Sequence, residues 1–406
     1  MQAEHTKNLN LPAQHLPLAA QGLKHFLRDL AYGHLSIHFD HAPSLHLHGR
    51  RDGPHAHWNL HHPAQLLQRV LRGGVIGFAE GFHEGDWSSP DVAKLLYLGA
   101  LNMDAMEAQL RPHWFLRQLH RLQHLRRPNS KRGSRKNIAA HYDLGNDFYR
   151  LWLDESMSYS SALFTHPEAS LAQAQEAKYA RLLGLLDAKP GQHILEIGCG
   201  WGGFSEHAAR RGFQTTGITL SQEQLKWSEQ RVHEAGLAAQ VNFSLTDYRD
   251  QSGEFDHIVS IEMFEAVGEK YWPSYFQSVY RRLAPGGRAV IQVIVIDEAD
   301  YPRYRREPDY IQLYIFPGGM LPTQNLFVQG AQAAGLQVRD QALFGLDYAR
   351  TLALWREAFE AKNTDITALG YDPRFCRMWS YYLAYCEAAF RAGRVNLLQI
   401  VLEKPA

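Results

Sequence analysis

The sequence predicts an α/β protein in which a mostly parallel sheet, covered by helices on both faces, follows a smaller α+β domain. From residue 192 onward, short apolar runs alternate with helical segments, which is the order typical of parallel sheets. Before about residue 125, short alternating runs and glycine-rich segments indicate a separate fold. The length of 406 residues suits two or three domains. We expect a boundary between domains 1–125 and 126–406.

The composition is that of a folded protein with no overall charge. Apolar residues make up 45% of the chain, and 42 basic residues balance 42 acidic ones. Any attraction to nucleic acid or to a membrane therefore needs a local patch. The cysteines, Cys199, Cys376 and Cys386, lack the spacing of a disulfide framework or a zinc site, which favours the cytoplasm. No signal peptide or transmembrane run is indicated.

The first domain is expected to begin with a frayed end and a short sheet. Residues 1–17 show no periodicity, whereas residues 33–58 alternate apolar and polar side chains, which predicts an antiparallel meander. Residues 63–71 predict a helix. The glycine-rich stretches 73–81 and 85–91 predict turns that lead into a helix capped by Ser or Asp.

Two biased segments have both a structural and a functional interpretation. Nine histidines lie between His34 and His62, and they lack the companion ligands of a metal site. We expect them on a solvent-facing side of the sheet, where they would make the surface charge sensitive to pH. Eight basic residues without an acidic one lie between Arg117 and Lys136. This run is either a solvated linker or a contact with an anionic surface, lipid or RNA.

In the second domain, apolar runs predict six strands. They cover residues 193–198, 214–219, 241–246, 255–262, 288–296 and 397–402. The first strand ends in the glycine-rich run 196–203, which allows the backbone to turn sharply and approach a ligand at the carboxyl edge of the sheet. The spacing is not that of a dinucleotide-binding loop. It resembles motif I of S-adenosylmethionine (AdoMet) methyltransferases, which implies a Rossmann-like class I methyltransferase domain.

Five further segments extend this resemblance to one family. The segments 141–149, 159–162, 217–221, 263–268 and 314–319 occur together and in order. With them the chain resembles the cyclopropane fatty acid synthase family, which is related to the mycolic acid cyclopropane synthases. The resemblance implies that residues 126–406 form the catalytic domain and that residues 1–125 form an accessory, lipid-associated domain. It also implies a homodimer.

The resemblance implies a cofactor site for AdoMet. Its residues would be Tyr142, Tyr159, Ser160, Gly198, Gly200, Trp201, Thr219, Gln224, Asp247 and Tyr248. The first three would border the methionine end, and the pair Thr219 and Gln224 would contact the ribose. Asp247 and Tyr248 would lie beside adenine.

The resemblance also implies a catalytic site in which a bound bicarbonate acts as the base. Glu265 and Tyr348 match the family's Glu and Tyr, and the backbone of Ser161 and Ile294 would complete the site. Gln292 stands where the family has a His. Glutamine can donate and accept hydrogen bonds but cannot become a cation, so the anion site would be less positive.

We therefore expect a cytoplasmic enzyme, peripheral at the inner face of an anionic phospholipid membrane, that adds a methylene from AdoMet to the cis double bond of an unsaturated phospholipid acyl chain. The segment 297–323 would form a lid over the cofactor, and aromatic residues of the helical stretch 355–390 would line the other side. The first alternative is an acyl C-methyltransferase that gives methyl- or methylene-branched chains. A lipid carrier without turnover and an RNA methyltransferase are further alternatives.

Overall fold

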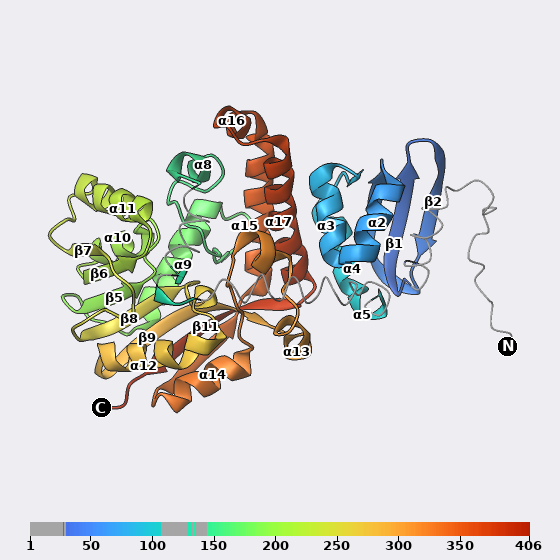
Figure 1. Cartoon of the computed structure of the whole chain (residues 1–406). Helices are drawn as coiled ribbons and strands as arrows, with labels where there is room; N and C mark the ends of the chain where they lie inside the picture. The colour runs from blue at the N-terminus through green and yellow to red at the C-terminus, as the bar shows by residue number, and fades with distance from the viewer. Residues whose placement is uncertain (1–26, 28–29, 107–128, 132, 135–143) are drawn as a thin grey trace. The chain divides into compact units, whose positions relative to one another are not determined.

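The computed structural model describes residues 27, 30–106, 129–131, 133–134 and 144–406, and the chain divides into two compact units (Figure 1). One unit comprises residues 1–120 and 370–392, and the other comprises residues 121–369 and 393–406. This division differs from the expected boundary because helix α17 (Pro373–Arg391) packs against two helices of the N-terminal unit. Residues 1–17 and, apart from Lys131, the basic run lie outside the described residues.

The N-terminal unit contains a four-stranded sheet in the order β2-β1-β3-β4. Its strands are β1 (Tyr32–Phe39), β2 (Ala42–His48), β3 (Arg51–Leu60) and β4 (Trp87–Ser88). Strand β2 is antiparallel to β1, but β3 lies on the other side of β1 and runs parallel to it. The predicted meander is therefore wrong. Gly49 permits the crossing, since a Cβ there would lie 2.6 Å from the backbone of Tyr32.

One glycine of this unit, Gly77, allows two helices to pack closely, where the sequence had predicted a turn. The helices are α2 (Pro63–Gly73), α3 (Val75–Glu84), α4 (Val92–Leu101) and α5 (Met103–Met106). Helix α2 and the capped helix α4 were expected, but α3 forms where turns were predicted. A Cβ on Gly77 would lie 2.0 Å from the carbonyl oxygen of Arg69, so glycine here lets α3 contact α2.

Six of the nine histidines form one cluster on the sheet. Leu35 and Ile37 of β1 are buried on the opposite face, so the alternating histidines share the other side. Their rings contact one another across three strands; the members are His34, His38, His46, His48, His55 and His57. No group of His, Cys, Asp or Glu in the described part of the chain could hold a metal ion.

The larger unit is built on a seven-stranded sheet in the order β10-β11-β9-β8-β5-β6-β7. The strands are β5 (His193–Ile197), β6 (Gln214–Thr219), β7 (Val241–Leu245), β8 (Phe255–Ile261), β9 (Leu283–Ile296), β10 (Gln337–Leu343) and β11 (Val395–Glu403). Strands β5 to β9 pair in parallel, whereas β11 is antiparallel to both β9 and β10. The six predicted strands are present, and β10 was not predicted.

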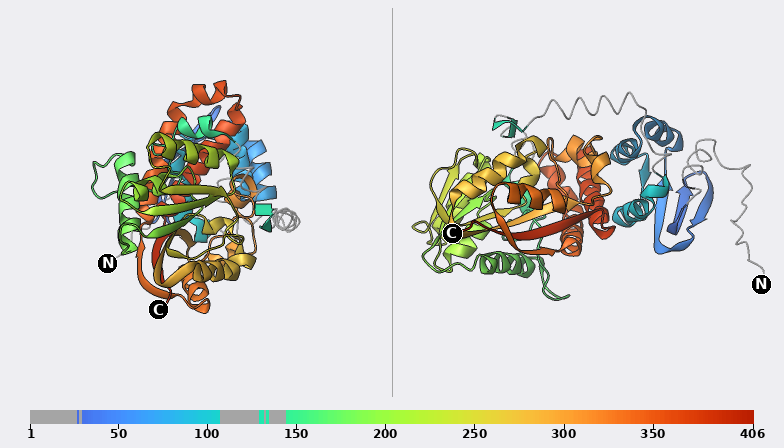
Figure 2. Two further views of the ribbon diagram at one scale, coloured as in Figure 1. Left: turned by 90° about the vertical axis from the view of Figure 1, so that its left-hand side faces the viewer. Right: turned by 90° about the horizontal axis from the view of Figure 1, so that it is seen from below.

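Helices cover both faces of this sheet (Figures 1 and 2). The described helices of this unit are α8 (Asn146–Arg150), α9 (Leu171–Leu185), α10 (Gly203–Ala209), α11 (Gln222–Glu234), α12 (Trp272–Arg282), α13 (Tyr301–Tyr304), α14 (Gln324–Ala333), α15 (Gly345–Ala361) and α16 (Asn363–Ala368). Helices α12 and α14 pack on one face, and α9 and α10 on the other. Among the described helices, none is long and apolar enough to cross a membrane. The fold places the carboxyl ends of the parallel strands at one edge, where α/β proteins bind ligands.

Candidate active site

The glycine-rich loop after β5 turns closely around its neighbours. Gly198 and Gly200 have positive φ angles of 84° and 51°, which favour glycine. A Cβ on Gly198 would lie 2.8 Å from the Met263 side chain, so the loop and the end of β8 are in direct contact. Trp201 is buried and its indole nitrogen donates to Asn146 Oδ1 at 2.7 Å. The loop is therefore held by α8 on one side and by β8 on the other.

Thr219 and Gln224 form a second predicted group, at the end of β6. Both are buried, and Thr219 Oγ1 donates to Gln224 Oε1 at 2.9 Å. Ser221 caps α11 by accepting from the Gln224 backbone N–H. Thr219 thus ends β6, the strand next to β5, and Gln224 faces it from the first turn of α11.

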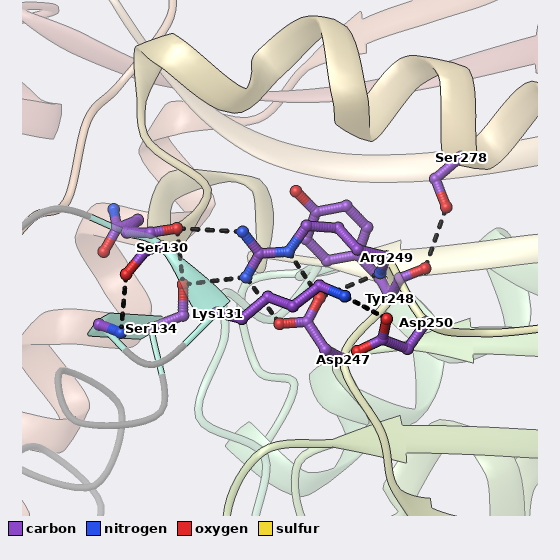
Figure 3. Close-up of polar contacts among 10 residues, drawn as sticks. Ser130, Lys131, Ser134, Asp247, Tyr248, Arg249, Asp250 and Ser278 are labelled. Carbon is purple, nitrogen blue, oxygen red and sulfur yellow. Dashed lines mark hydrogen bonds and ion pairs between the residues drawn. The ribbon is translucent and has the colours of Figure 1, made fainter.

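Asp247 is held in an ion pair after β7 (Figure 3). Its two carboxylate oxygens accept from Arg249 Nε at 2.8 Å and from an Arg249 terminal nitrogen at 2.6 Å. Burial raises the pKa of Asp247, but these hydrogen bonds and the arginine charge outweigh it and bring the pKa below its ordinary value. Arg249 also donates to the backbone carbonyl of Asn129. The predicted adenine contact therefore coincides with an ion pair whose arginine also ties this loop to Asn129 and Ser134.

The segment 159–161 is fixed by a buried lysine. Lys178 Nζ donates to Ser160 Oγ at 2.7 Å and to Gln175 Oε1 at 2.6 Å. Burial lowers the pKa of Lys178 to about 8, although the charge of Glu262 opposes this shift. Tyr159 packs its ring against Trp355. Tyr142, the remaining predicted residue of this group, lies outside the described residues.

The predicted catalytic residues converge on a carboxylate that the sequence analysis did not single out. Glu262, directly after β8, accepts from the backbone N–H of Ser161 at 2.9 Å and from Gln292 Nε2 at 2.7 Å through Oε1. Its Oε2 accepts from the hydroxyl of Tyr348 at 2.6 Å. Three of the five predicted groups therefore contact Glu262.

The other two predicted catalytic groups contact each other. Glu265 Oε1 accepts from the backbone N–H of Ile294 at 2.6 Å. Its Oε2 is buried and has no hydrogen-bond partner among the residues that the structure describes. Burial, together with the nearby charge of Glu262, raises the pKa of Glu265 to about 8. The site thus contains two carboxyl groups that are close enough for the charge on one to raise the pKa of the other.

Part of the predicted lid segment lies against this centre. The backbone N–H of Met320 donates to the Glu265 carbonyl oxygen at 2.8 Å, and Gln312 Nε2 donates to the Gly319 carbonyl oxygen at 2.8 Å. A π-helical turn (Ile311–Ile315) precedes this contact. Such turns are frequent at functional sites. The segment is therefore in place to cover Glu265.

Three residues of the centre were missed in the sequence for an identifiable reason. Glu262, Gln399 and Arg181 belong to no motif. Glu262 and Gln399 both contact Gln292 because the sheet order places β9 between β8 and β11, and Arg181, on α9, reaches Gln399 from a helix. An acidic residue at the end of a parallel strand was the one available signal for Glu262.

Comparison with known proteins identifies the family. The sequence profile of the mycolic acid cyclopropane synthetase family matches residues 129–400. The chain is 41% identical to tuberculostearic acid methyltransferase UfaA1 of Mycobacterium tuberculosis over 355 residues, covering 84% of this chain and 82% of that protein. It is 36% identical to cyclopropane-fatty-acyl-phospholipid synthase of Escherichia coli over 342 residues, covering 84% and 86%.

A solved structure supports the same assignment and the cofactor. The crystal structure of mycolic acid cyclopropane synthase CmaA1 complexed with SAH and CTAB superposes with a TM-score of 0.63 at 31% identity, covering 66% of this chain and 98% of that one. SAH is the product that AdoMet leaves after methyl transfer. The chain belongs to the mycolic acid cyclopropane synthetase family and is an AdoMet-dependent methyltransferase that modifies lipids.

Proposed function

We propose that this chain transfers the methyl group of AdoMet to the cis double bond of an unsaturated phospholipid acyl chain. The observation that carries the proposal is the carboxyl-rich centre at the end of β8, in contact with the glycine loop through Met263. An isolated alkene is a poor nucleophile, so the reaction needs a dry, aligned site. It also needs a base, because methyl transfer leaves a carbocation that must lose a proton.

We assign the cofactor to the groups at the carboxyl edge of β5, β6 and β7. Gly198, Gly200 and Trp201 would follow its amino acid and sugar, and Thr219 with Gln224 would reach the ribose. Close approach of a ligand to backbone requires glycines of this kind. The adenine would lie beside Tyr248 and the ion pair of Asp247.

The product depends on how the cation is resolved. Direct loss of a proton from the new methyl group, with ring closure, gives a cyclopropane. Migration of a hydride to the cationic carbon before that loss gives a methylene-branched chain. We place the branched product first, because UfaA1 is named for a methyl-branched acid and because Gln292 cannot carry the charge of a histidine. The cyclopropane is the second candidate, favoured by the likeness to the E. coli synthase.

A phospholipid substrate implies contact with a membrane surface. We propose that the protein is peripheral, that it approaches an anionic leaflet, and that it acts as a homodimer. Lys131, the described member of the basic run, forms an ion pair with Asp250, so attraction to lipid would rest on other charges.

Product analysis tests this proposal. Purified protein is incubated with [methyl-13C]AdoMet and liposomes of a cis-monounsaturated phospholipid, and the extracted lipids are examined by 13C and proton NMR. Liposomes of the saturated phospholipid serve as the control. Label in an alkene methylene carbon supports the branched product, and label in a high-field ring methylene supports the cyclopropane. Absence of labelled lipid, with AdoMet binding shown by calorimetry, would contradict the function.

A further inference from the structure

We propose that Glu262 is the base that removes the proton from the transferred methyl group, in the place that a bound bicarbonate would take. This inference rests on the proposed methyl transfer to an alkene. Glu262 follows β8 at the edge of the sheet, and its backbone N–H donates to the Gln292 carbonyl oxygen at 2.8 Å. The residue is half-buried, as a protein base that meets its substrate must be.

The hydrogen bonds of Glu262 leave no anion site for bicarbonate. Ser161, Gln292 and Tyr348 were expected to hold that anion, and all three donate to Glu262 instead. A bicarbonate would have to share these donors and would lie against a like charge. The residues present therefore fit a carboxylate of the protein and do not fit an added bicarbonate.

A chain of oriented hydrogen bonds requires Glu262 to be the acceptor. Arg181 Nε donates to Gln399 Oε1 at 2.9 Å, and Gln399 Nε2 donates to Gln292 Oε1 at 2.7 Å. Because arginine can only donate, it fixes the orientation of the Gln399 amide, and Gln399 in turn fixes that of Gln292. The Gln292 amide therefore presents its NH₂ group to Glu262. This arrangement favours the ionised carboxylate, which is the form that a base needs.

The two carboxyl groups of the centre differ in their surroundings. Glu262 accepts three hydrogen bonds from protein groups, whereas Glu265 accepts one, from Ile294. The raised pKa of Glu265, to about 8, follows from its burial and from the negative charge on Glu262. Burial also raises the pKa of Glu262, which makes its carboxylate a stronger base than one in water. Because three donors face Glu262 and one faces Glu265, the hydrogen bonds favour a negative charge on Glu262 over one on Glu265.

The backbone at Glu262 supports a functional role. Its φ angle is 51°, and among the described residues only Met157 and Asp187 are other non-glycine residues with positive φ. Residues with side chains avoid this region unless the surroundings enforce it, and such residues concentrate at active sites. The conformation aims the carboxylate at the donors of Ser161 and Tyr348.

The proposed step conserves atoms and charge. The alkene π electrons form a bond to the AdoMet methyl carbon, the sulfur keeps the pair of the broken S–C bond, and the positive charge passes to the substrate. Glu262 then takes one proton from the new methyl group. The released C–H pair closes the ring or, after hydride migration, forms the C=C bond. Neutral product and a protonated Glu262 remain, and the proton passes to water when the product leaves.

Two substitutions at Glu262 and labelled bicarbonate test the inference. Glu262→Gly removes the carboxylate and suits the positive φ, so its fold should be retained, whereas Glu262→Gln removes the base but still fills the space. In bicarbonate-depleted buffer we expect unchanged turnover of the parent protein and a loss of at least about 100-fold in both variants. Added bicarbonate should raise the rate of Glu262→Gly at least about tenfold but should not rescue Glu262→Gln. Glu254→Gln, at the exposed residue just before β8, is the matched control.

Binding of 13C-bicarbonate, followed by NMR line broadening, supplies a readout that does not depend on turnover. Glu262→Gly should bind bicarbonate, and the parent protein should not. Bicarbonate binding by the parent, a parent rate that requires bicarbonate, or more than a tenth of parent activity in Glu262→Gln would each overturn the inference. If the parent binds AdoMet but makes no product, the proposed function fails, and the binding comparison still shows whether Glu262 fills the anion site.

Discussion

Reversing one amide of the hydrogen-bond chain should disable the centre without unfolding it. Gln399 accepts from Arg181 and donates to Gln292, and it is buried on β11. In Gln399→Glu the new carboxylate would still accept from Arg181, now as an ion pair, and has nearly the volume of glutamine. It can no longer donate to Gln292. The Gln292 amide would therefore turn its NH₂ group to residue 399 and its oxygen to Glu262.

The size of the effect follows from the bond that is lost. The Gln292 hydrogen bond to Glu262 is 2.7 Å long and ends on a charged group. Such bonds contribute about 1.5–3 kcal/mol, which corresponds to roughly 10- to 150-fold in rate. Facing oxygens add repulsion, so we expect a loss toward the upper end of this range. AdoMet affinity should stay within about twofold, because β11 is not adjacent to β5 or β6.

Single-turnover transfer from [methyl-13C]AdoMet to liposomal lipid measures this prediction, with AdoMet binding by calorimetry alongside. Glu403→Gln is the matched control, since Glu403 lies on the same strand but pairs with Arg288 and Arg339 away from the centre. The control should keep parent activity. A Gln399→Glu rate within twofold of the parent would refute the oriented chain as the feature that fixes Glu262.

Three further predictions concern stability. The raised pKa of Glu265 means that the folded protein holds a proton that the unfolded chain releases, so the free energy of unfolding falls as pH rises from about 4.5 to about 8. Glu265→Gln does not titrate, so its free energy of unfolding, measured in urea, should rise relative to that of the parent by up to about 1.4 kcal/mol per pH unit in this range. Burial lowers the pKa of His83 to about 4, so the free energy of unfolding of the parent should fall by up to about 3 kcal/mol as pH falls from 6.5 to 4. This fall should be absent from His83→Gln, and an equal fall in both proteins would exclude His83 as the cause. In thermal unfolding, Gly77→Ala should destabilise the protein by about 3 kcal/mol or more, because the new Cβ would collide with the Arg69 carbonyl oxygen. Gly99→Ala, on α4 where a Cβ has open space, should be neutral or stabilise the protein by up to about 1 kcal/mol. Similar effects of both substitutions would contradict the close contact of α2 and α3.

The buried strands of the larger unit could be predicted from the sequence because their side chains are apolar on both faces. Ile194, Leu195 and Val259 are fully or almost fully buried, and such runs identify parallel strands. Strand β10 could not be predicted, because it lies at the edge of the sheet and most of its residues are polar and exposed. Helix α3 was missed because Gly77 and Gly81, which usually indicate turns, serve close packing here.

The candidate site was predicted in part, through the resemblance. It named Ser161, Gln292 and Tyr348, which the structure does bring together. It could not show that these three groups donate to Glu262. Glu262 and Glu265 are only three residues apart, and the sequence does not tell which of the two carboxylates accepts the hydrogen bonds. That assignment depends on the positive φ at Glu262 and on the neighbouring strands. The roles of the cofactor residues remain predictions.

Methyl transfer by the parent protein in bicarbonate-depleted buffer tests the account most directly. Protein, [methyl-13C]AdoMet and cis-monounsaturated phospholipid liposomes are combined under argon, and labelled lipid is followed by NMR with and without added bicarbonate. If Glu262 is the base, label enters a methylene carbon of the acyl chain at the same rate in both buffers. Labelled lipid that forms only when bicarbonate is present would contradict the role of Glu262, and no labelled lipid in either buffer would contradict the proposed reaction.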